Sequence, residues 1–139
     1  MIRLSTEARN AIGNQLNDLL DNGVLKSASY LEIRSGSRPT SPDFPATGTL
    51  LATITLPASG FGTFTAGKAS IPALTASQVI VNDGLAGYFR AYNRDNTPIM
   101  DGIVGLANTG ADLVFDRVDF VAGGSIAISN FTLTIPTEC

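Results

Sequence analysis

The chain has 139 residues, which corresponds to one domain and is long enough to bury a core without disulfides. Its hydrophobic fraction of 44% argues against disorder, while its charged fraction of 15% is well below the roughly one quarter of ordinary proteins. The net charge is −3, and the nine Lys and Arg residues are scattered, which argues against binding to nucleic acid or to an anionic membrane surface.

The low charge and the mean hydropathy of +0.20 have two interpretations. Part of the surface is covered in an assembly, or the surface is an ordinary β surface rich in Thr, Ser and Asn. Apolar stretches are too short to cross a bilayer, and residues 1–7 lack the apolar core of a signal peptide. We therefore expect neither membrane insertion nor secretion.

The first predicted element is a helix over residues 5–22. Ser5 or Thr6 is suited to cap it, and Glu7 lies in its first turn. Residues 8, 11, 12, 16, 19 and 20 are apolar and recur at helical spacing, so we expect them to form the packed face and the polar residues, Asn10 and Asn17 among them, to be solvated. The pair Asn22-Gly23 predicts the end of the helix.

The next predicted elements are a strand over residues 30–34 and a proline-rich loop over residues 35–47. Leu31 and Ile33 alternate with Glu32, as in a strand with one buried face. Pro39, Pro42 and Pro45 exclude a central strand, because each lacks the N–H that a strand ladder needs. The loop is either an extended arm or a crossover between two sheets.

Further strands are predicted over residues 49–56, 87–92, 99–104 and 111–115, with a hairpin turn at residues 93–96. In the last segment Ile126 and Ile128 have the opposite parity to Phe131, Leu133 and Ile135. This predicts a bulge or a change of face near Ser129-Asn130. The chain is thus expected to be mainly β, a single domain over residues 1–139 with an antiparallel β-sandwich or jelly-roll-like fold and one N-terminal α-helix.

No residues form a convincing catalytic, cofactor or metal site. The sequence has no histidine, and its one cysteine is Cys139. The usual general base is therefore missing, as is the usual metal ligand. Asp95, Asp101, Asp112, Asp116 and Asp119 include potential acid–base pairs or calcium ligands, but they lie in or near predicted turns and strand ends, where Asp is common. We expect no enzyme activity and no cofactor.

Tyr30, Tyr88 and Tyr92 are candidates for a face on which a sugar or a base stacks. Tyrosine is also common on solvated strand faces without any ligand, and this second interpretation is favoured.

Several segments, in order along nearly the whole chain, resemble a family of small structural proteins of tailed bacteriophages and prophages. These segments are residues 3–11 (RLSTEARNA), 31–36 (LEIRSG), 45–52 (PATGTLLA), 87–92 (GYFRAY), 101–105 (DGIVG) with 111–113 (ADL), and 131–134 (FTLT). The resemblance implies a virion protein assembled in the host cytoplasm, and it brings no catalytic motif with it.

The leading hypothesis is a minor capsid or decoration (cement) protein that binds the major capsid protein lattice and stabilises the head. Such a protein would act by burying apolar surface and strand edges, as a trimer or a dimer. The alternative is a tail- or fibre-associated virion protein that binds a tail protein or a host-surface glycan. The expected protein interface comprises Arg38, Pro39, Pro42, Phe44 and Pro45 of the loop and Ile12 and Leu16 of the helix.

Overall fold

A single N-terminal helix precedes a series of short strands in the part of the chain that the structure describes. The structure is a computed structural model that describes residues 1–57, 61–71, 78–126, 128 and 130–138. Its elements are α1 (Thr6–Leu20), β1 (Tyr30–Ser35), β2 (Leu50–Thr55), β3 (Lys68–Ile71), β4 (Gln78–Val79), β5 (Gly84–Tyr92), β6 (Pro98–Gly105), β7 (Leu113–Val114), β8 (Asp119–Phe120), β9 (Ser125–Ile126) and β10 (Asn130–Thr134).

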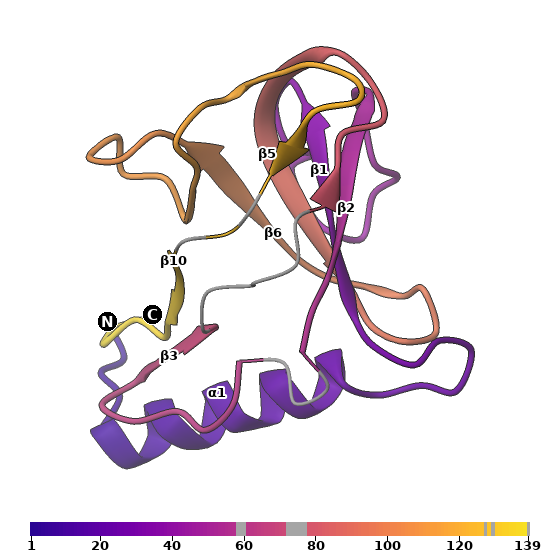
Figure 1. The fold of residues 1–139 in the computed structure, drawn as a ribbon. Helices are drawn as coiled ribbons and strands as arrows, with labels where there is room; N and C mark the ends of the chain where they lie inside the picture. Colours follow the sequence, from indigo (N-terminus) through magenta and orange to yellow (C-terminus); the bar gives the residue numbers. More distant parts are fainter. Residues whose placement is uncertain (58–60, 72–77, 127, 129, 139) are drawn as a thin grey trace.

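Most of these strands join one curled sheet, which Figure 1 shows above α1. The eight-stranded sheet has the order β2-β1-β5-β6-β7-β10-β3, and β8 pairs with β5. Its neighbours are antiparallel except for β6 and β7, which are parallel. β4 and β9 form a separate two-stranded sheet. The predicted mainly β fold with one N-terminal helix is confirmed. Where a sandwich or jelly-roll-like arrangement of antiparallel strands was expected, most strands belong to one curled, antiparallel-rich sheet that surrounds the core.

The core lies on the concave side of the curled sheet and follows the alternation of the strands. Leu31 and Ile33 of β1 and Phe89 of β5 are almost fully buried. The Phe131 ring of β10 packs edge-on against the Phe89 and Phe61 rings, with ring centroids 5.1 Å and 5.0 Å apart respectively. Burying side chains of this size stabilises the fold by roughly 1.5–3 kcal/mol each.

The helix begins as predicted and ends earlier. The Ser5 hydroxyl accepts a hydrogen bond from the Ala8 N–H at 3.1 Å, so Ser5 is the N-cap. The helix ends at Leu20 rather than at residue 22. A tertiary contact explains the difference: the Asn22 carbonyl accepts a hydrogen bond from the Arg94 N–H at 3.0 Å, which turns the chain away from the helix axis.

The predicted packed face of the helix is confirmed only in part, and the prediction that its polar residues are solvated is wrong for Asn10 and Asn17. Asn10, Asn14 and Asn17 each accept a backbone hydrogen bond through the side-chain oxygen, from Gly67, Phe64 and Phe61 respectively, at 2.7–2.9 Å. Leu20 is buried and Leu16 packs partly against the core, but Ile12 and Leu19 are 46% and 45% exposed. The packed face of the helix is therefore a row of asparagine side chains around Gly13, and the Phe64 ring packs against Gly13.

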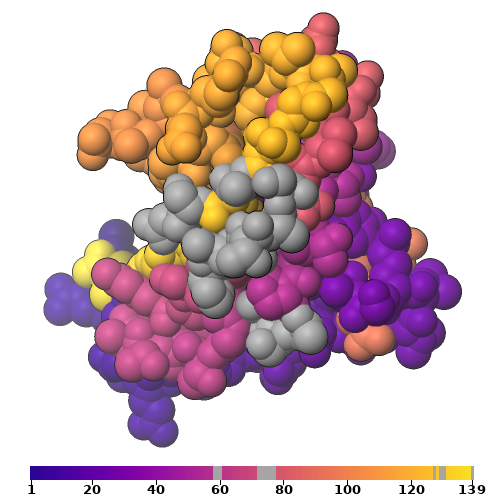
Figure 2. Space-filling view, in the orientation of Figure 1, coloured from indigo at the N-terminus to yellow at the C-terminus, as the bar shows by residue number. Residues whose placement is uncertain are grey.

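The predicted hairpin turn at residues 93–96 is confirmed and carries a second role. The Asp95 carboxylate accepts hydrogen bonds from the N–H groups of Val24, at 2.6 Å, and Leu25, at 3.0 Å. These two bonds hold the pKa of Asp95 below its usual value. Figure 2 shows the purple surface of residues 21–28 against the salmon surface of this hairpin.

The last segment buries residues of both parities, as its sequence predicts. Ile126 and Ile128 are buried, and so are Phe131 and Ile135. Ile126 belongs to β9, which pairs with β4, whereas Phe131 belongs to β10, which pairs with β3 and β7. Ser129, where the bulge was expected, lies outside the described residues.

Candidate functional site

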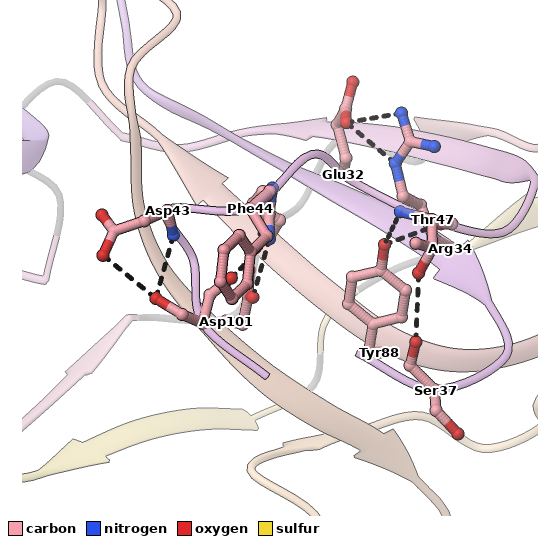
Figure 3. A network of polar contacts seen from close by, with 10 residues as sticks. Glu32, Arg34, Ser37, Asp43, Phe44, Thr47, Tyr88 and Asp101 are labelled. Atoms are coloured by element: carbon pink, nitrogen blue, oxygen red, sulfur yellow. Dashed lines mark hydrogen bonds and ion pairs between the residues drawn. The ribbon is translucent and has the colours of Figure 1, made fainter. Parts of the chain in front are cut away.

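The proline-rich loop between β1 and β2 is folded onto the outer face of the sheet. We call residues 36–48 the pinned loop. β1 and β2 are antiparallel neighbours in one sheet, so the loop is not a crossover between sheets. Nor is it a free arm, because side chains of β5 hold its backbone at several points (Figure 3). Carbonyl groups make most of these contacts, because the Arg90 guanidinium can only donate hydrogen bonds.

Tyr88 is the first anchor of the pinned loop. Its side chain is fully buried, and its hydroxyl lies against the backbone of Thr47 (Figure 3). The hydroxyl accepts a hydrogen bond from the Thr47 N–H at 2.9 Å and donates one to the Thr47 carbonyl at 2.7 Å. One side chain thus satisfies both backbone groups of a loop residue, as a strand partner would.

Arg90 and Asp101 form the second anchor. They are opposite each other on β5 and β6, and their side chains are 2% and 3% exposed. Arg90 donates two parallel hydrogen bonds to the Asp101 carboxylate, Nε to Oδ1 at 2.6 Å and Nη2 to Oδ2 at 2.9 Å. Its Nη1 donates to the Phe44 carbonyl at 2.7 Å. The hydrogen bonds to Asp101 raise the pKa of Arg90 against the opposing effect of burial, so the guanidinium remains charged.

This network fixes the shape of the loop. A buried charged pair is stable only when the hydrogen-bonding groups of both partners are satisfied. Here Nη1 of Arg90, which does not bond the Asp101 carboxylate, donates to the Phe44 carbonyl of the loop. Phe44, whose carbonyl is held, keeps its own side chain 55% exposed. The fold therefore presents an aromatic side chain on a fixed backbone.

Arg38 lies between two cavities beside the pinned loop. The first has a volume of about 440 Å³ and is lined by Arg38, Pro39, Thr40, Pro42 and Asp101. The second, of about 320 Å³, extends from Arg38 and Asp101 to β10. The predicted interface residues Arg38, Pro39 and Pro42 are thus brought together. Phe44 and Pro45 are exposed further along the same loop.

The other two predicted interface residues lie elsewhere. Ile12 and Leu16 belong to α1, which Figure 1 shows below the sheet and away from the upper ends of β1 and β2 that carry the loop. Ile12 is exposed, whereas Leu16 packs partly against the core. The seven predicted residues therefore fall on two separate surfaces.

The three tyrosines do not form the exposed stacking face that the sequence allowed. Tyr88 is buried under the loop, and Tyr30 and Tyr92 stack on each other with ring centroids 5.0 Å apart and an interplanar angle of 10°. Lys26 Nζ lies 5.0 Å from the centroid of the Tyr30 ring. Burial, and then the neighbouring Glu32 carboxylate, raise the pKa of Tyr92 to about 12. Tyr30 still lines a cavity of about 310 Å³ with Lys26, Thr53 and Thr55.

The aspartates remain separate. Asp95 caps a backbone turn, Asp101 is bound by Arg90, and Asp112 accepts a hydrogen bond from the Ile103 N–H at 2.8 Å. Within the described residues, no group of three or more His, Cys, Asp or Glu side chains is arranged to hold a metal ion. In the same part of the chain no helix has the length and apolar character needed to cross a membrane.

The sequence interpretation missed the Tyr88–Arg90–Asp101 network, although a signal for it was present. Tyr88 and Arg90 alternate with apolar residues in the strongest predicted strand, and Arg90 lies three residues before the predicted hairpin turn while Asp101 lies five residues after it. A register shift between Ala91 and Tyr92 brings the two opposite each other. Opposite charges at such positions face each other across a hairpin.

The chain matches no family model, no curated protein and no solved structure at a significant level.

Proposed function

We propose that this chain is a non-catalytic structural protein of a tailed-phage virion, a decoration protein that binds the major capsid protein lattice through the pinned loop. The observation that carries the proposal is the buried Arg90–Asp101 pair, which holds the loop and leaves Phe44 exposed. The virion context comes from the resemblance of the sequence segments to small phage structural proteins.

A fixed loop is suited to binding protein because little conformational entropy is lost when it docks. Aromatic side chains near the centre of an interface contribute much of its binding free energy. Phe44 has this character, and the prolines beside it stiffen the backbone further. The low charge of the chain fits an interface whose centre excludes charged residues.

The first test is the composition of the virion. Particles of the phage or prophage that encodes this chain would be purified by density gradient and analysed by mass spectrometry. We expect the protein in stoichiometric amounts, and cryo-electron microscopy should place it on the head. Density on the tail or a fibre would favour the tail-associated alternative, and absence of the protein from the particles would refute both virion proposals.

The second test addresses the loop itself. Particles that lack the protein would be mixed with purified wild-type chain, with Phe44→Ser, or with Leu25→Ser as the matched control. Both side chains are exposed, at 55% and 70%, so neither change should weaken the fold. Loss of an aromatic anchor typically reduces affinity by about 2 kcal/mol, which is roughly thirtyfold. Equal binding of the two variants would show that the pinned loop is not the docking site.

A further inference from the structure

The main sheet contains a slot that is one strand wide between β6 and β10. β7 fills one end of it, pairing with β6 at Val104 and Gly105 and with β10 at Asn130 and Phe131. β7 is only two residues long, whereas β6 and β10 both continue past it. No described strand pairs with β6 on this side over residues 98–103.

The part of the slot beyond β7, which no described strand occupies, is a cavity of about 320 Å³ with both strands in its walls. Met100, Asp101 and Gly102 line it on the β6 side, and residues 131–134 line it on the β10 side. Ala111 and Asp112, which lead into β7, form one end. Where β7 lies between them, β6 and β10 are two strand spacings apart, roughly 9.5 Å, so the cavity begins at a gap that is one strand wide.

The backbone of β6 is oriented to accept that strand. Ile103 directs both of its backbone groups toward β7, because its carbonyl accepts from the Asp112 N–H at 2.9 Å and its N–H donates to the Asp112 carboxylate at 2.8 Å. Backbone groups alternate in direction along a strand. The N–H and C=O of Asp101 therefore face the slot, whereas Gly102 faces β5 opposite Phe89.

The side chains around the slot define the chemistry of an occupant. Phe89 and Phe131 lie at its base and are buried in the core, so alternate residues of the occupant that point inward should be apolar. Arg38 lines the cavity and is exposed. Among the described residues it has no ion-pair partner. The two carboxylates that line the cavity together with Arg38 are already engaged, Asp101 by Arg90 and Asp112 by the Ile103 N–H.

We propose that the slot binds an extended segment of another protein, which pairs with β6 as a continuation of β7 and places a carboxylate against Arg38. This mode of recognition combines main-chain hydrogen bonds with pockets for alternate side chains. The slot adjoins the pinned loop, which contributes Arg38, but the inference rests on the unpaired backbone of β6 and not on capsid binding, so either can fail without the other.

Hydrogen exchange of the free, full-length chain gives the first test. The Asp101 amide should exchange much faster than the Gly102 amide, because Gly102 is paired with β5 and Asp101 faces the slot. Equal protection of the two amides in the free protein would overturn the proposal. Protection of the Asp101 amide that grows with protein concentration would also overturn it, since a second copy of this chain would then be the occupant.

Peptide selection gives the second test. A displayed library of random decapeptides would be selected on the full-length chain and counter-selected on Arg38→Glu. We expect peptides with alternating apolar residues and at least one Asp or Glu, and slower exchange of the Asp101 amide when a selected peptide is bound. Arg38→Glu should weaken binding by about three- to tenfold, as expected for reversal of an exposed ion pair.

The matched control is Arg117→Glu, which reverses a charge that is 66% exposed and absent from the walls of the slot. It should leave the affinity for the selected peptide unchanged. Equal affinity for the wild-type chain and Arg38→Glu, or equal loss in the two variants, would refute the role of Arg38. Failure of the library to yield any peptide that prefers the wild-type chain would refute the proposal as a whole.

Discussion

Arg90 has a structural role that depends on where its charge lies. The Nε of Arg90 lies 2.6 Å from Oδ1 of Asp101, and both side chains are almost fully excluded from solvent. In water the pairing of a guanidinium with a carboxylate contributes little to the free energy of folding. Removal of either partner would therefore leave the other as a buried charge without a counter-ion. The pair also satisfies the Phe44 carbonyl of the pinned loop, so its loss would affect more than one strand contact.

Replacement of Asp101 by Asn should strongly destabilise the protein. The change leaves the Arg90 charge buried without its counter-ion, and breaking such a pair costs about 3–5 kcal/mol. Urea denaturation would measure the free energy of unfolding. The matched control is Asp119→Asn, because that carboxylate pairs with Arg117 at 3.4 Å but is 74% exposed, and its loss should cost less than about 1 kcal/mol. Similar costs for the two variants would contradict the structural role given to the Arg90–Asp101 pair.

Tyr92 should make the stability depend on pH in the alkaline range. Its pKa is about 12 in the folded chain and about 10 in the unfolded chain. On raising the pH the unfolded chain therefore releases this proton first. The stabilisation is complete below about pH 10 and is lost progressively up to about pH 12.

Ultraviolet titration of the tyrosinate absorbance would give the ionisation midpoint, and denaturation over the same range would give the loss of stability. Tyr92→Phe should remove the step near pH 12 and make the unfolding free energy less sensitive to alkaline pH. A wild-type chain whose three tyrosines all ionise together near pH 10 would contradict the expected burial of Tyr92.

Among the elements, α1 is held against the rest of the protein largely by polar side chains. Its asparagines accept hydrogen bonds from the backbone N–H groups of Phe61, Phe64 and Gly67, which belong to the segment before β3 and have no strand partner for those bonds. Gly13 lies in the middle of this face, where the Phe64 ring occupies the space of a missing side chain. Apolar periodicity alone points to a face turned further toward Ile12 and Leu19, which are partly exposed.

Gly13→Ala should therefore destabilise the protein although alanine favours helices. A Cβ at this position would lie 2.2 Å from Cδ2 of Phe64. The gain in helix propensity of about 1 kcal/mol is outweighed by an overpacking cost of roughly 1–3 kcal/mol, and rigid backbone on both sides of the contact favours the upper part of that range. Thermal denaturation monitored by circular dichroism would measure the change.

Two further variants separate packing from helix propensity. Gln15→Ala changes an exposed position of the same helix and should alter stability by less than about 0.5 kcal/mol. Phe64→Leu combined with Gly13→Ala should recover part of the loss, because the smaller side chain leaves room for the added methyl group. A stabilising effect of Gly13→Ala alone would show that the ring does not pack against this glycine.

In the molecule as a whole, α1 closes one end of the curled sheet. Figure 1 shows the helix beneath β3 and β10, with the two chain ends side by side. The ends are joined by a hydrogen bond from the Leu4 N–H to the Thr137 carbonyl at 2.8 Å and by the exposed Arg3–Glu138 ion pair at 3.4 Å. Phe61 and Phe64 are buried in the same cluster as the residues of β1 and β5, so we expect helix and sheet to unfold together.

Deletion of residues 1–20 should abolish the native packing of the sheet. It would expose the Phe61 and Phe64 rings and leave three backbone N–H groups without their asparagine acceptors. We expect retained β-structure with loss of the near-ultraviolet circular dichroism signal and binding of a hydrophobic dye. Deletion of residues 1–3 alone, which removes the exposed Arg3–Glu138 ion pair, should leave the signal intact. A native-like spectrum after the longer deletion would show that the sheet folds independently of α1.

Local patterns along the sequence were sufficient to predict the class of fold. The capping serine, the alternation in β1 and β5 and the turn at residues 93–96 depend on neighbouring residues, and each was found where it was predicted. The two parities of the final segment likewise predicted that it serves two packing regions. Whether the chain belongs to a virion is a hypothesis that the particle experiments decide.

Only the tertiary structure decided what the charged and polar residues do. Arg90, Asp101 and the asparagines of α1 look like surface residues in the sequence, because polar residues are usually solvated. Their partners lie far away in the chain, at Phe44 for Arg90 and at Gly67 for Asn10. The pinned loop and the slot beside β6 both arise from such long-range contacts, and residue patterns within a segment do not encode them.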